Sequence, residues 1–425
     1  EYLAQHAGYT RVHNPVTGEK DLVRLPGLVG VGYQHETSRC GDPHLHTHVI
    51  VPNRQARADG ALVSVDGTSL FHEAKAAGVI YQATLRRELH RSVGFEWEQV
   101  DPSTGMAEVA GVTRDCITAW SRRSSQLRDW AAGHLAVGED GAWSPGQLAA
   151  AQKATRPTKP EELAWTTLLE QWRADLRGLI LDRVGFLAAR AARRAAADAP
   201  WDRARICAAA EHIEKATFTR ADLIEVLGAQ VPVDSEVSPR ELVEAAVDAV
   251  SVRLSAPRAR HEREGHERFT LEAILAEERE VLALVDARND RARLWICDED
   301  TAALSADQRA AVKAIGASPW LVQPLTAPAG AGKTTCLRAL AAAARRRFGG
   351  ATIVLAPTGK AVDVALGEGA GDRGYTIANA LQLLRDDQFE AGSATLVVVD
   401  ETAMVGTGDL KVLLTATTAA GAKTV

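Results

Sequence analysis

Four histidines lie close together near the start of the chain: His35, His44, His46 and His48. If residues 45–51 form a strand, its alternation places His46 and His48 on one face, and His35 ends the preceding strand. Three neutral imidazoles can hold a divalent cation and leave positions open for water or a phosphate oxygen, which is the form of a catalytic metal site. Spacing alone also allows an exposed histidine-rich strand or a structural zinc site, and it does not decide which three histidines bind.

A second group has the spacing of a phosphate-binding loop: Ala327-Pro-Ala-Gly330-Ala-Gly332-Lys333-Thr334. A predicted strand over 321–325 precedes it, and it opens a predicted helix over 333–348. Backbone N–H groups of Gly330, Gly332 and the helix start, which includes Thr335, can therefore cradle the phosphates of ATP. We expect Lys333 to reach the β- and γ-phosphates and the Thr334 hydroxyl to bind Mg²⁺.

Two carboxylates, Asp400 and Glu401, end the apolar run 396–399. After a phosphate-binding loop, Asp400 is expected to hold Mg²⁺ through water, and Glu401 to orient the water that attacks ATP. Upstream, Gln308 lies where an adenine-reading glutamine would lie. However, Ser305-Ala-Asp-Gln308 is also a helix capping box, and both roles can hold together.

The elements that must position these residues change along the chain. Short apolar runs and turn residues over 1–130 predict strands at 27–35 and 45–51 and helices at 72–93 and 113–131. On the second strand, Leu45, Thr47, Val49 and Val51 are expected to face a core. A Gly- and Pro-rich stretch over 133–160 predicts a boundary.

Residues 145–290 are predicted to be mostly helical, since capping boxes begin at Thr219 and Ser238. From about residue 303 the pattern becomes strand–helix–strand. The short apolar runs 321–325, 352–356 and 396–399 suit a parallel sheet that is buried on both faces. This layout is typical of an α/β nucleotide-binding domain.

Composition excludes several classes of protein. The 425 residues are 46% hydrophobic and 24% charged, which is typical of a globular protein with two or three domains. No stretch of about 18 apolar residues lacks a charge, so no membrane segment is expected. Five scattered cysteines fit a reducing cytoplasm. Because the net charge is −6, nucleic-acid binding needs local patches such as Arg122 and Arg123, although a solvated helix face is the commoner meaning of such a pair.

The C-terminal motifs resemble superfamily 1 helicases of the RecD-like group. The resemblance rests on Ser305–Gln308, the phosphate-binding loop, Leu355-Ala-Pro-Thr-Gly-Lys360-Ala361, Tyr375-Thr-Ile377 and Val399-Asp-Glu401, in that order. In that group the segment matching 357–360 contacts single-stranded DNA, which implies Thr358 and Lys360 as DNA contacts. The resemblance also implies a motor driven by ATP and Mg²⁺.

The histidine run resembles the conjugative relaxases of the MobF family. Their motif pairs a first histidine with His-x-His eleven and thirteen residues on, separated by Ser-Arg and Asp-Pro, as in this chain. The resemblance implies His35, His46 and His48 as metal ligands and leaves His44 outside. It also implies nicking of one DNA strand by a tyrosine, with Mg²⁺ or Mn²⁺ at the histidines, whereas imidazoles alone suggest zinc, which we expect to bind in vitro.

The nucleophilic tyrosines of that family lie near its N-terminus, in a context that Tyr2, Tyr9 and Tyr33 do not match. The chain starts at Glu1 rather than Met and stops at Val425 inside an apparent strand. We therefore expect it to be a fragment that binds metal and does not form the covalent DNA–tyrosine bond unaided.

Together the resemblances imply three parts. These are an α+β relaxase palm with an antiparallel sheet and helices over 1–135, a mostly helical connecting region over 136–300, and an incomplete α/β RecA-like P-loop domain with a parallel sheet over 301–425. The implied partners are single-stranded and origin-of-transfer DNA, conjugation accessory proteins and secretion machinery, in the bacterial cytoplasm. The alternatives are a RecD-like repair helicase with a metal-binding N-terminal domain, and a non-catalytic DNA-binding remnant of a mobile element.

Overall fold

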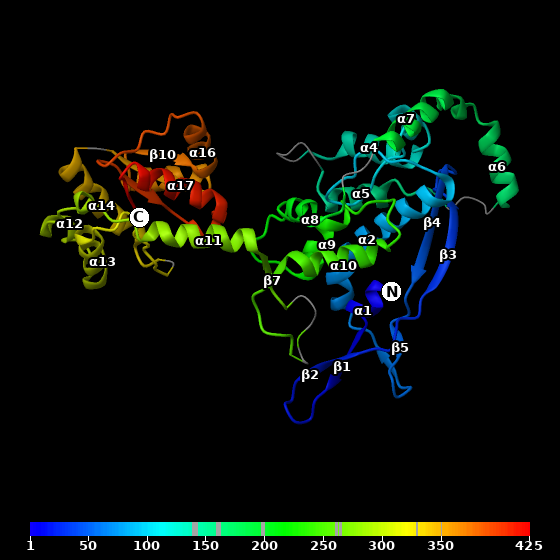
Figure 1. Cartoon of the computed structure of the whole chain (residues 1–425), viewed down its shortest axis with the longest axis horizontal. Coiled ribbons are helices and arrows are strands. Elements are labelled where there is room, and N and C mark those ends of the chain that lie inside the picture. Colours follow the sequence, from blue (N-terminus) through cyan, green and yellow to red (C-terminus); the bar gives the residue numbers. More distant parts are fainter. Residues whose placement is uncertain are drawn as a thin grey trace. The chain divides into compact units, whose positions relative to one another are not determined.

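The computed structural model describes residues 1–137, 143–158, 163–196, 200–259, 262, 266–328, 330–349 and 351–425. Contacts divide the chain into two units, Glu1–Phe269 and Thr270–Val425 (Figure 1). Within the described ranges, no helix combines the length and apolarity that crossing a bilayer requires. The three-part division over 1–135, 136–300 and 301–425 stays a prediction.

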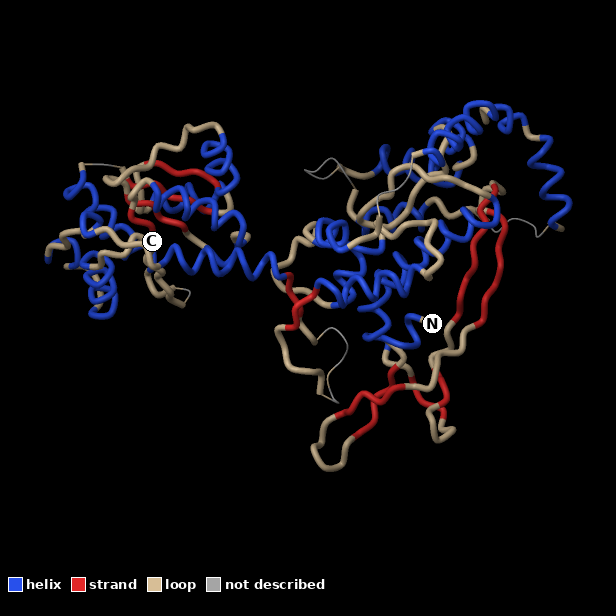
Figure 2. The backbone as a smooth tube through the Cα atoms, viewed as in Figure 1, coloured by secondary structure: helices blue, strands red, loops and turns tan. Residues whose placement is uncertain are grey.

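Strands of the first unit pair as antiparallel hairpins (Figure 2). The hairpins are β1 with β2, β3 with β4, and β5 with β6. Their bounds are Tyr9–His13, Lys20–Arg24, Val31–Thr37, Pro43–Ile50, Arg54–Ala56 and Leu62–Ser64, in chain order. Short strands β7 (Ser251–Arg253) and β8 (Phe269–Leu271) follow later in the chain. The antiparallel pairing expected of the α+β part is therefore confirmed.

Helices make up most of the remainder of this unit. They are α1 (Tyr2–His6), α2 (Gly67–Val93), α3 (Arg114–Ala119), α4 (Arg122–His134), α5 (Pro145–Ala154), α6 (Trp165–Ala174), the 3-10 helix η1 (Leu176–Ile180), α7 (Arg183–Ala195), α8 (Arg203–Ala210), α9 (Arg220–Gly228) and α10 (Pro239–Val250). The long helix α2 packs against α9 and α10. The capping boxes predicted at Thr219 and Ser238 are both formed.

One sequence-based prediction about this unit is wrong in detail. The single helix expected over 113–131 is two helices, because the chain breaks at Trp120-Ser121 and the Asp42 carboxylate caps the new N-terminus through the Arg122 N–H. The stretch 133–160 contains the helix α5, as the mostly helical pattern predicted from residue 145 requires; α5 has its own capping box at Ser144 and packs on α4.

The second unit is built on a parallel sheet with strand order β10-β9-β11-β12. The strands are β9 (Thr352–Ala356), β10 (Arg373–Thr376), β11 (Leu396–Val399) and β12 (Lys423–Thr424). The helices are α11 (Glu272–Val285), η2 (Asp290–Ala292), α12 (Asp298–Thr301), α13 (Ala306–Ala317), α14 (Lys333–Phe348), α15 (Gly359–Gly367), α16 (Ile377–Arg385), η3 (Thr402–Met404) and α17 (Thr407–Ala419). Every residue of β9 and β11 is buried, as predicted for a parallel sheet covered on both faces.

Side chains from the two faces of this sheet enter separate clusters. Val354 and Val398 pack with Leu337 and Leu340 of α14. Leu355 and the other inward residues of the opposite face pack with α16 and α17. The start of α14 is thus fixed against the centre of the sheet.

The prediction of a regular strand over 321–325 is wrong. Only Val322 pairs, in a parallel bridge with Thr424. The Gln323 N–H donates to the Thr424 carbonyl at 2.8 Å, but Pro324 has no N–H to continue the ladder. The segment still lies beside β12, so the chain leaves the sheet just before the phosphate-binding loop.

Candidate functional site

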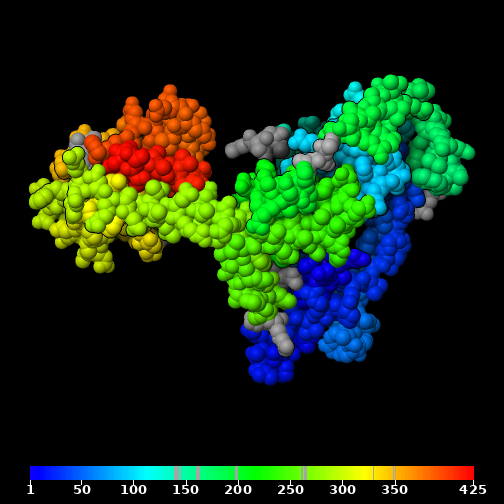
Figure 3. Space-filling view, viewed as in Figure 1, coloured from blue at the N-terminus to red at the C-terminus, as the bar shows by residue number. Residues whose placement is uncertain are grey.

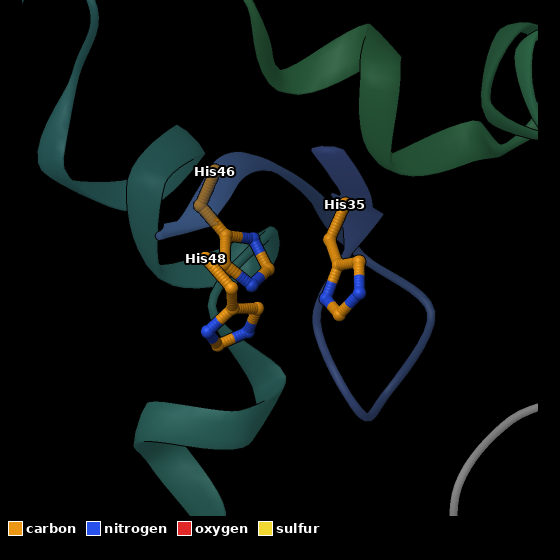
Figure 4. A group of neighbouring side chains, drawn as sticks. All are labelled: His35, His46 and His48. Carbon is orange, nitrogen blue, oxygen red and sulfur yellow. The ribbon is translucent and has the colours of Figure 1, made fainter. Parts of the chain in front are cut away.

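The β3–β4 hairpin brings three histidines to one face. In its register His35 lies opposite His46, and Tyr33 lies opposite His48. Directly opposed residues of an antiparallel pair project from the same face, so these four side chains are neighbours. One ligand atom from each of His35, His46 and His48 lies within 4.8 Å of the others. Figure 4 shows the three rings gathered around a common space.

This donor set fits a divalent cation. Imidazole nitrogens bound at ~2.0–2.1 Å around a tetrahedral ion lie about 3.4 Å apart. The three rings must therefore turn toward one another before their nitrogens reach one ion. The Nδ1 of His46 lies 2.7 Å from the His44 carbonyl oxygen. Because a carbonyl only accepts, Nδ1 carries the proton and Nε2 is left for a metal, a common arrangement around metal-binding histidines.

His44 differs from the other three histidines. Its ring stacks on that of His46, with centroids 4.4 Å apart, and it is not a member of the clustered ligand atoms. Burial, and then the nearby charge of His46, lower the pKa of His44. Spacing alone did not distinguish His44 from the other histidines. The hairpin does, because His35 pairs with His46, and the register then shifts between His35 and Thr37, next to His44.

The prediction that one face of β4 packs against a core is wrong. Leu45 and Val49 are 64% and 65% exposed, and Val51 is 37% exposed. Thr47 on the same face is also exposed. The physical reason is that β4 pairs with β3 alone. Among the described residues, no element covers this face of the two-stranded ribbon. Figure 3 shows the blue surface of this part of the chain open along one edge of the unit.

Arg122 and Arg123, the predicted DNA contacts, both make bonds within the protein. The Arg122 Nε donates to Asp42 Oδ1 at 2.8 Å, and Arg177 donates to the same oxygen at 2.8 Å. Arg123 donates to the carbonyl oxygens of Thr155 at 2.9 Å and Gln152 at 3.0 Å. Arg122 therefore neutralises a buried carboxylate. The carbonyl groups that Arg123 contacts are neutral, so these bonds do not cancel its positive charge.

The phosphate-binding loop has the backbone that its glycines predict. Gly330 and Gly332 adopt φ of +77° and +80°, which glycine tolerates best, and Lys333 is the first residue of α14. Ala329 lies outside the described residues. Thr334 and Thr335 follow in the first turn, with the Thr335 hydroxyl next to Gly332. The N–H groups of this turn are the donors that phosphate oxygens need.

Gln308 is both a cap and a neighbour of that loop. Its side chain completes the capping box with Ser305. Its Nε2 also donates to the Ala331 carbonyl at 2.8 Å. The capping interpretation is thus confirmed, and the second bond holds the same side chain against the phosphate-binding loop.

The predicted carboxylates and DNA-contacting residues lie at one edge of the sheet. Asp400 follows β11 and donates its N–H to the Leu355 carbonyl of β9 at 2.9 Å. Thr358 follows β9 and caps α15, whose first turn holds the exposed Lys360. Because β9 and β11 are parallel neighbours, their carboxyl ends share an edge. Glu401 has φ of +53°, an uncommon conformation for a residue other than glycine.

Sequence reasoning missed two features of the histidine region. Tyr33 is two residues before His35, so strand alternation places both side chains on one face, and the sequence could have shown this. Tyr33 lies opposite His48 and is 51% exposed. Asp42 is 1% exposed and is bound by Arg122 and Arg177. No local spacing announces that network, because its members are 80 and 135 residues apart.

Comparison with known proteins gives two family matches. Residues 1–179 match the TrwC relaxase family, and residues 303–425 match an AAA domain family. The chain is similar to the multifunctional conjugation protein TraI of Escherichia coli, with 34% identity over 172 residues, covering 38% of this chain and 9% of TraI. TraI of strain K12 is 30% identical over 172 residues, with the same coverage. The match thus spans about a tenth of the length of these curated relatives.

Solved structures of the conjugative relaxase TrwC with oriT DNA are also similar. The metal-free form is 26% identical, with a TM-score of 0.37, and the match covers 42% of this chain and 61% of that one. The copper-bound form has the same identity and TM-score, with coverage of 42% and 59%.

Proposed function

Because the chain joins a TrwC-type relaxase domain over residues 1–179 to a helicase-like AAA domain over residues 303–425, we propose that it is part of a conjugative relaxase–helicase. Such a protein nicks one strand of origin-of-transfer DNA by metal-dependent transesterification and unwinds DNA with ATP. The observation that carries this proposal is the cluster of His35, His46 and His48, with ligand atoms within 4.8 Å, in the relaxase region of a chain that also has a phosphate-binding loop.

In this proposal His35, His46 and His48 hold the cation and leave coordination positions for a phosphodiester oxygen. When bound, the cation withdraws charge from the phosphate and makes its phosphorus easier to attack by a hydroxyl. The His44 carbonyl keeps His46 in the tautomer that presents Nε2. We propose Mg²⁺ or Mn²⁺ in cells and also Zn²⁺ in vitro, since three imidazoles bind zinc well.

The second unit is proposed to bind Mg-ATP. Gly330, Gly332, Lys333, Thr334 and Thr335 hold the phosphates, with the Thr334 hydroxyl on Mg²⁺. Asp400 holds Mg²⁺ through water, and Glu401 orients the attacking water. Gln308 contacts adenine from its place against the loop. Thr358 and Lys360, at the same edge of the sheet, contact single-stranded DNA, which couples the two ligands.

The proposal extends to the setting of the protein. Its partners would be single-stranded and origin-of-transfer DNA, together with conjugation accessory proteins and secretion machinery, in the bacterial cytoplasm. The matched relaxase region speaks against a repair helicase whose N-terminal domain only carries a metal site.

A nicking assay tests this function. Supercoiled DNA that carries the region flanking the coding gene is incubated with the intact gene product and Mg²⁺ or Mn²⁺. Relaxed product that His46→Ala abolishes and His44→Ala preserves, with ATP turnover unchanged in both, supports the proposal. ATP turnover without metal-dependent cleavage favours the repair helicase, and failure to retain Mn²⁺ or to bind single-stranded DNA contradicts any DNA-processing role for the histidines.

A further inference from the structure

Large aliphatic side chains are exposed along a short segment of the first unit, η1 and α7 (Figure 1). They are Leu176, Leu179 and Ile180 of η1 and Val184 and Leu187 of α7. Their exposed fractions run from 44% for Ile180 to 82% for Leu179. A concentration of exposed apolar side chains such as this one is typical of a surface that contacts another molecule or a membrane.

One face of α7 holds the helix to the rest of the unit. Phe186 and Ala189 are three positions apart and therefore share this face. Both lie against Gly111, where a Cβ atom would come within 2.7 Å of the Phe186 Cα and 3.0 Å of the Ala189 Cβ. The Phe186 ring also meets the Phe95 ring, with centroids 6.4 Å apart. Leu187 is two positions from Ala189, or about 200° around the helix, so it points away from this packed face.

The outward face of α7 is an apolar stripe. Val184, Leu187, Ala188, Ala191 and Ala195 follow one another at the spacing of a single helix face, and all five are exposed. A helix on the surface of a globular protein ordinarily turns such a stripe toward the core. In α7 the stripe faces water instead, so packing within the described residues does not account for it.

Arginines run beside this stripe. Arg183, Arg190 and Arg194 are separated by seven and four positions, so they form one row along the helix. The Arg194 Nε lies 4.0 Å from Glu96, beyond hydrogen-bond distance, and among the described residues Arg183 and Arg190 form no ion pair. In a chain with a net charge of −6, this row is a local positive charge that attracts anions.

An exposed apolar stripe beside a row of arginines matches an anionic bilayer. DNA would bind the arginines through its phosphates, but it would leave the aliphatic side chains of the stripe in water. The surface of an anionic bilayer accepts both groups, because its phosphates bind arginine and its acyl chains receive aliphatic side chains. A helix with one apolar face and an arginine-rich polar face is typical of segments that lie in the plane of a bilayer surface.

We propose that η1 and α7 form a docking surface for a membrane that contains anionic phospholipids. The aliphatic side chains of η1 and α7 enter the headgroup region, and Arg183 and Arg190 bind the lipid phosphates. With 13 residues, α7 is too short to cross a bilayer and lies along its surface. The inference does not rest on the proposed function and goes beyond it, because it places the first unit at a membrane.

The test measures co-sedimentation of the full chain with vesicles of two compositions, phosphatidylcholine alone and phosphatidylcholine with phosphatidylglycerol in equal parts. We expect the chain to bind the anionic vesicles. Val184→Ser with Leu187→Ser should weaken this binding at least about tenfold, because burial of a single aliphatic side chain is worth such a factor. Arg183→Gln with Arg190→Gln should weaken binding to the anionic vesicles by about fivefold per arginine and leave binding to phosphatidylcholine unchanged.

The matched control is Val16→Ser with Leu62→Ser, which changes the same residue types at exposed positions outside η1 and α7. It should bind the vesicles like the wild type. Equal losses in the two serine variants would overturn the inference, and so would binding that does not depend on phosphatidylglycerol.

A third result would also overturn the inference. The wild type would bind no vesicles but would associate with itself, and Val184→Ser with Leu187→Ser would abolish that association. The surface would then join two copies of the chain. None of these outcomes bears on the proposed nicking activity, which its own assay tests.

Discussion

At the scale of single residues, the hairpin makes His44 and His46 chemically different although they share one strand face. The backbone of His44 matters, because its carbonyl accepts the His46 Nδ1–H at 2.7 Å. The His44 ring, in contrast, only stacks on the His46 ring. A side-chain replacement at His44 therefore leaves the proposed ligand set intact.

We accordingly predict opposite outcomes for two alanine variants. His48→Ala, at an exposed position of β4, should weaken Mn²⁺ binding by at least about 10-fold, since losing a ligand costs no less than losing one of its supporting contacts. His44→Ala should bind Mn²⁺ like the wild type. Isothermal titration of both variants with Mn²⁺ measures this, and equal losses in the two would contradict the assignment of the ligands.

Glu401 gives a prediction about stability. At φ of +53°, a non-glycine residue carries a strain of about 1 kcal/mol that glycine avoids. We expect Glu401→Gly to raise the free energy of unfolding by about 1 kcal/mol relative to Glu401→Ala, while both lose ATP turnover. Chemical denaturation followed by circular dichroism compares them. If the alanine variant is as stable as the glycine variant, the backbone at position 401 carries no such strain.

Residue patterns could be read from the sequence where the relevant partners are local. The capping boxes at Ser238 and Ser305 and the turn glycines Gly330 and Gly332 depend on a few neighbouring positions, and all four were predictable. The Asp42 network depends on arginines 80 and 135 positions away. Nothing in local spacing encodes such a pairing, so it appears only in the folded chain.

At the scale of elements, Asp42 holds the loop before β4 onto α4 and η1. Its carboxylate caps α4 through the Arg122 N–H at 2.9 Å and binds both guanidinium groups. The same loop leads directly into β4, which carries His44, His46 and His48. Loss of this carboxylate should therefore lower the stability of this unit.

Asp42→Asn is predicted to lower the free energy of unfolding by about 2 kcal/mol. Breaking a buried ion pair costs about 3–5 kcal/mol, and the cost is reduced here because the Arg122 side chain is 50% exposed. Urea denaturation measures the change. Asp59→Asn, which removes an exposed partner of Arg57, serves as the control and should be neutral. A neutral Asp42→Asn would show that the loop is held by other contacts.

Lys423 performs a similar task in the second unit. It is 1% exposed in β12, and its Nζ donates to the Ser318 carbonyl at 2.8 Å, which ties the segment before the phosphate-binding loop to the sheet. Burial, and then the charge of Arg293, lower the pKa of Lys423 to about 8. In the unfolded chain the amine keeps its ordinary pKa of about 10.4.

The sign of the resulting pH dependence follows from proton counts. Below about pH 8 both states hold the proton, and the folded state bears the cost of a buried charge. Between about pH 8 and pH 10.4 the unfolded state binds more protons, so stability rises with pH. We expect wild type to gain about 2 kcal/mol over Lys423→Met between about pH 7 and pH 10, by urea denaturation. A constant difference between the two proteins would contradict a lowered pKa.

Element boundaries were predictable where side chains alone decide them. The all-buried strands β9 and β11 follow from their continuous apolar runs. The predicted strand over 321–325 failed because Pro324 interrupts its ladder. The predicted core face of β4 failed because alternation shows which residues share a face, but not whether another element covers that face.

At the scale of the whole molecule, each unit contains its own core and its own proposed ligand site. The histidine cluster belongs to Glu1–Phe269, and the phosphate-binding loop belongs to Thr270–Val425. A ligand that binds only the folded form of a unit stabilises that unit by about 2.7 kcal/mol at 100 times its dissociation constant. The two ligands should therefore protect different peptides from hydrogen exchange.

We predict that Mn²⁺ slows exchange in β3 and β4, and that Mg-ATP slows exchange in β9, β11 and the start of α14. His48→Ala should remove the first effect and leave the second, while Lys333→Ala should do the reverse, because Lys333 is proposed to bind the phosphates. Mg²⁺ without nucleotide is the control for metal entering the histidine site during the ATP experiment. Hydrogen-exchange mass spectrometry resolves these peptides. One result would contradict the assignment of one site to each unit: Mn²⁺ protects β9 and β11, and this protection persists in Lys333→Ala but is lost in His48→Ala. The histidines would then control the stability of the ATP-binding sheet.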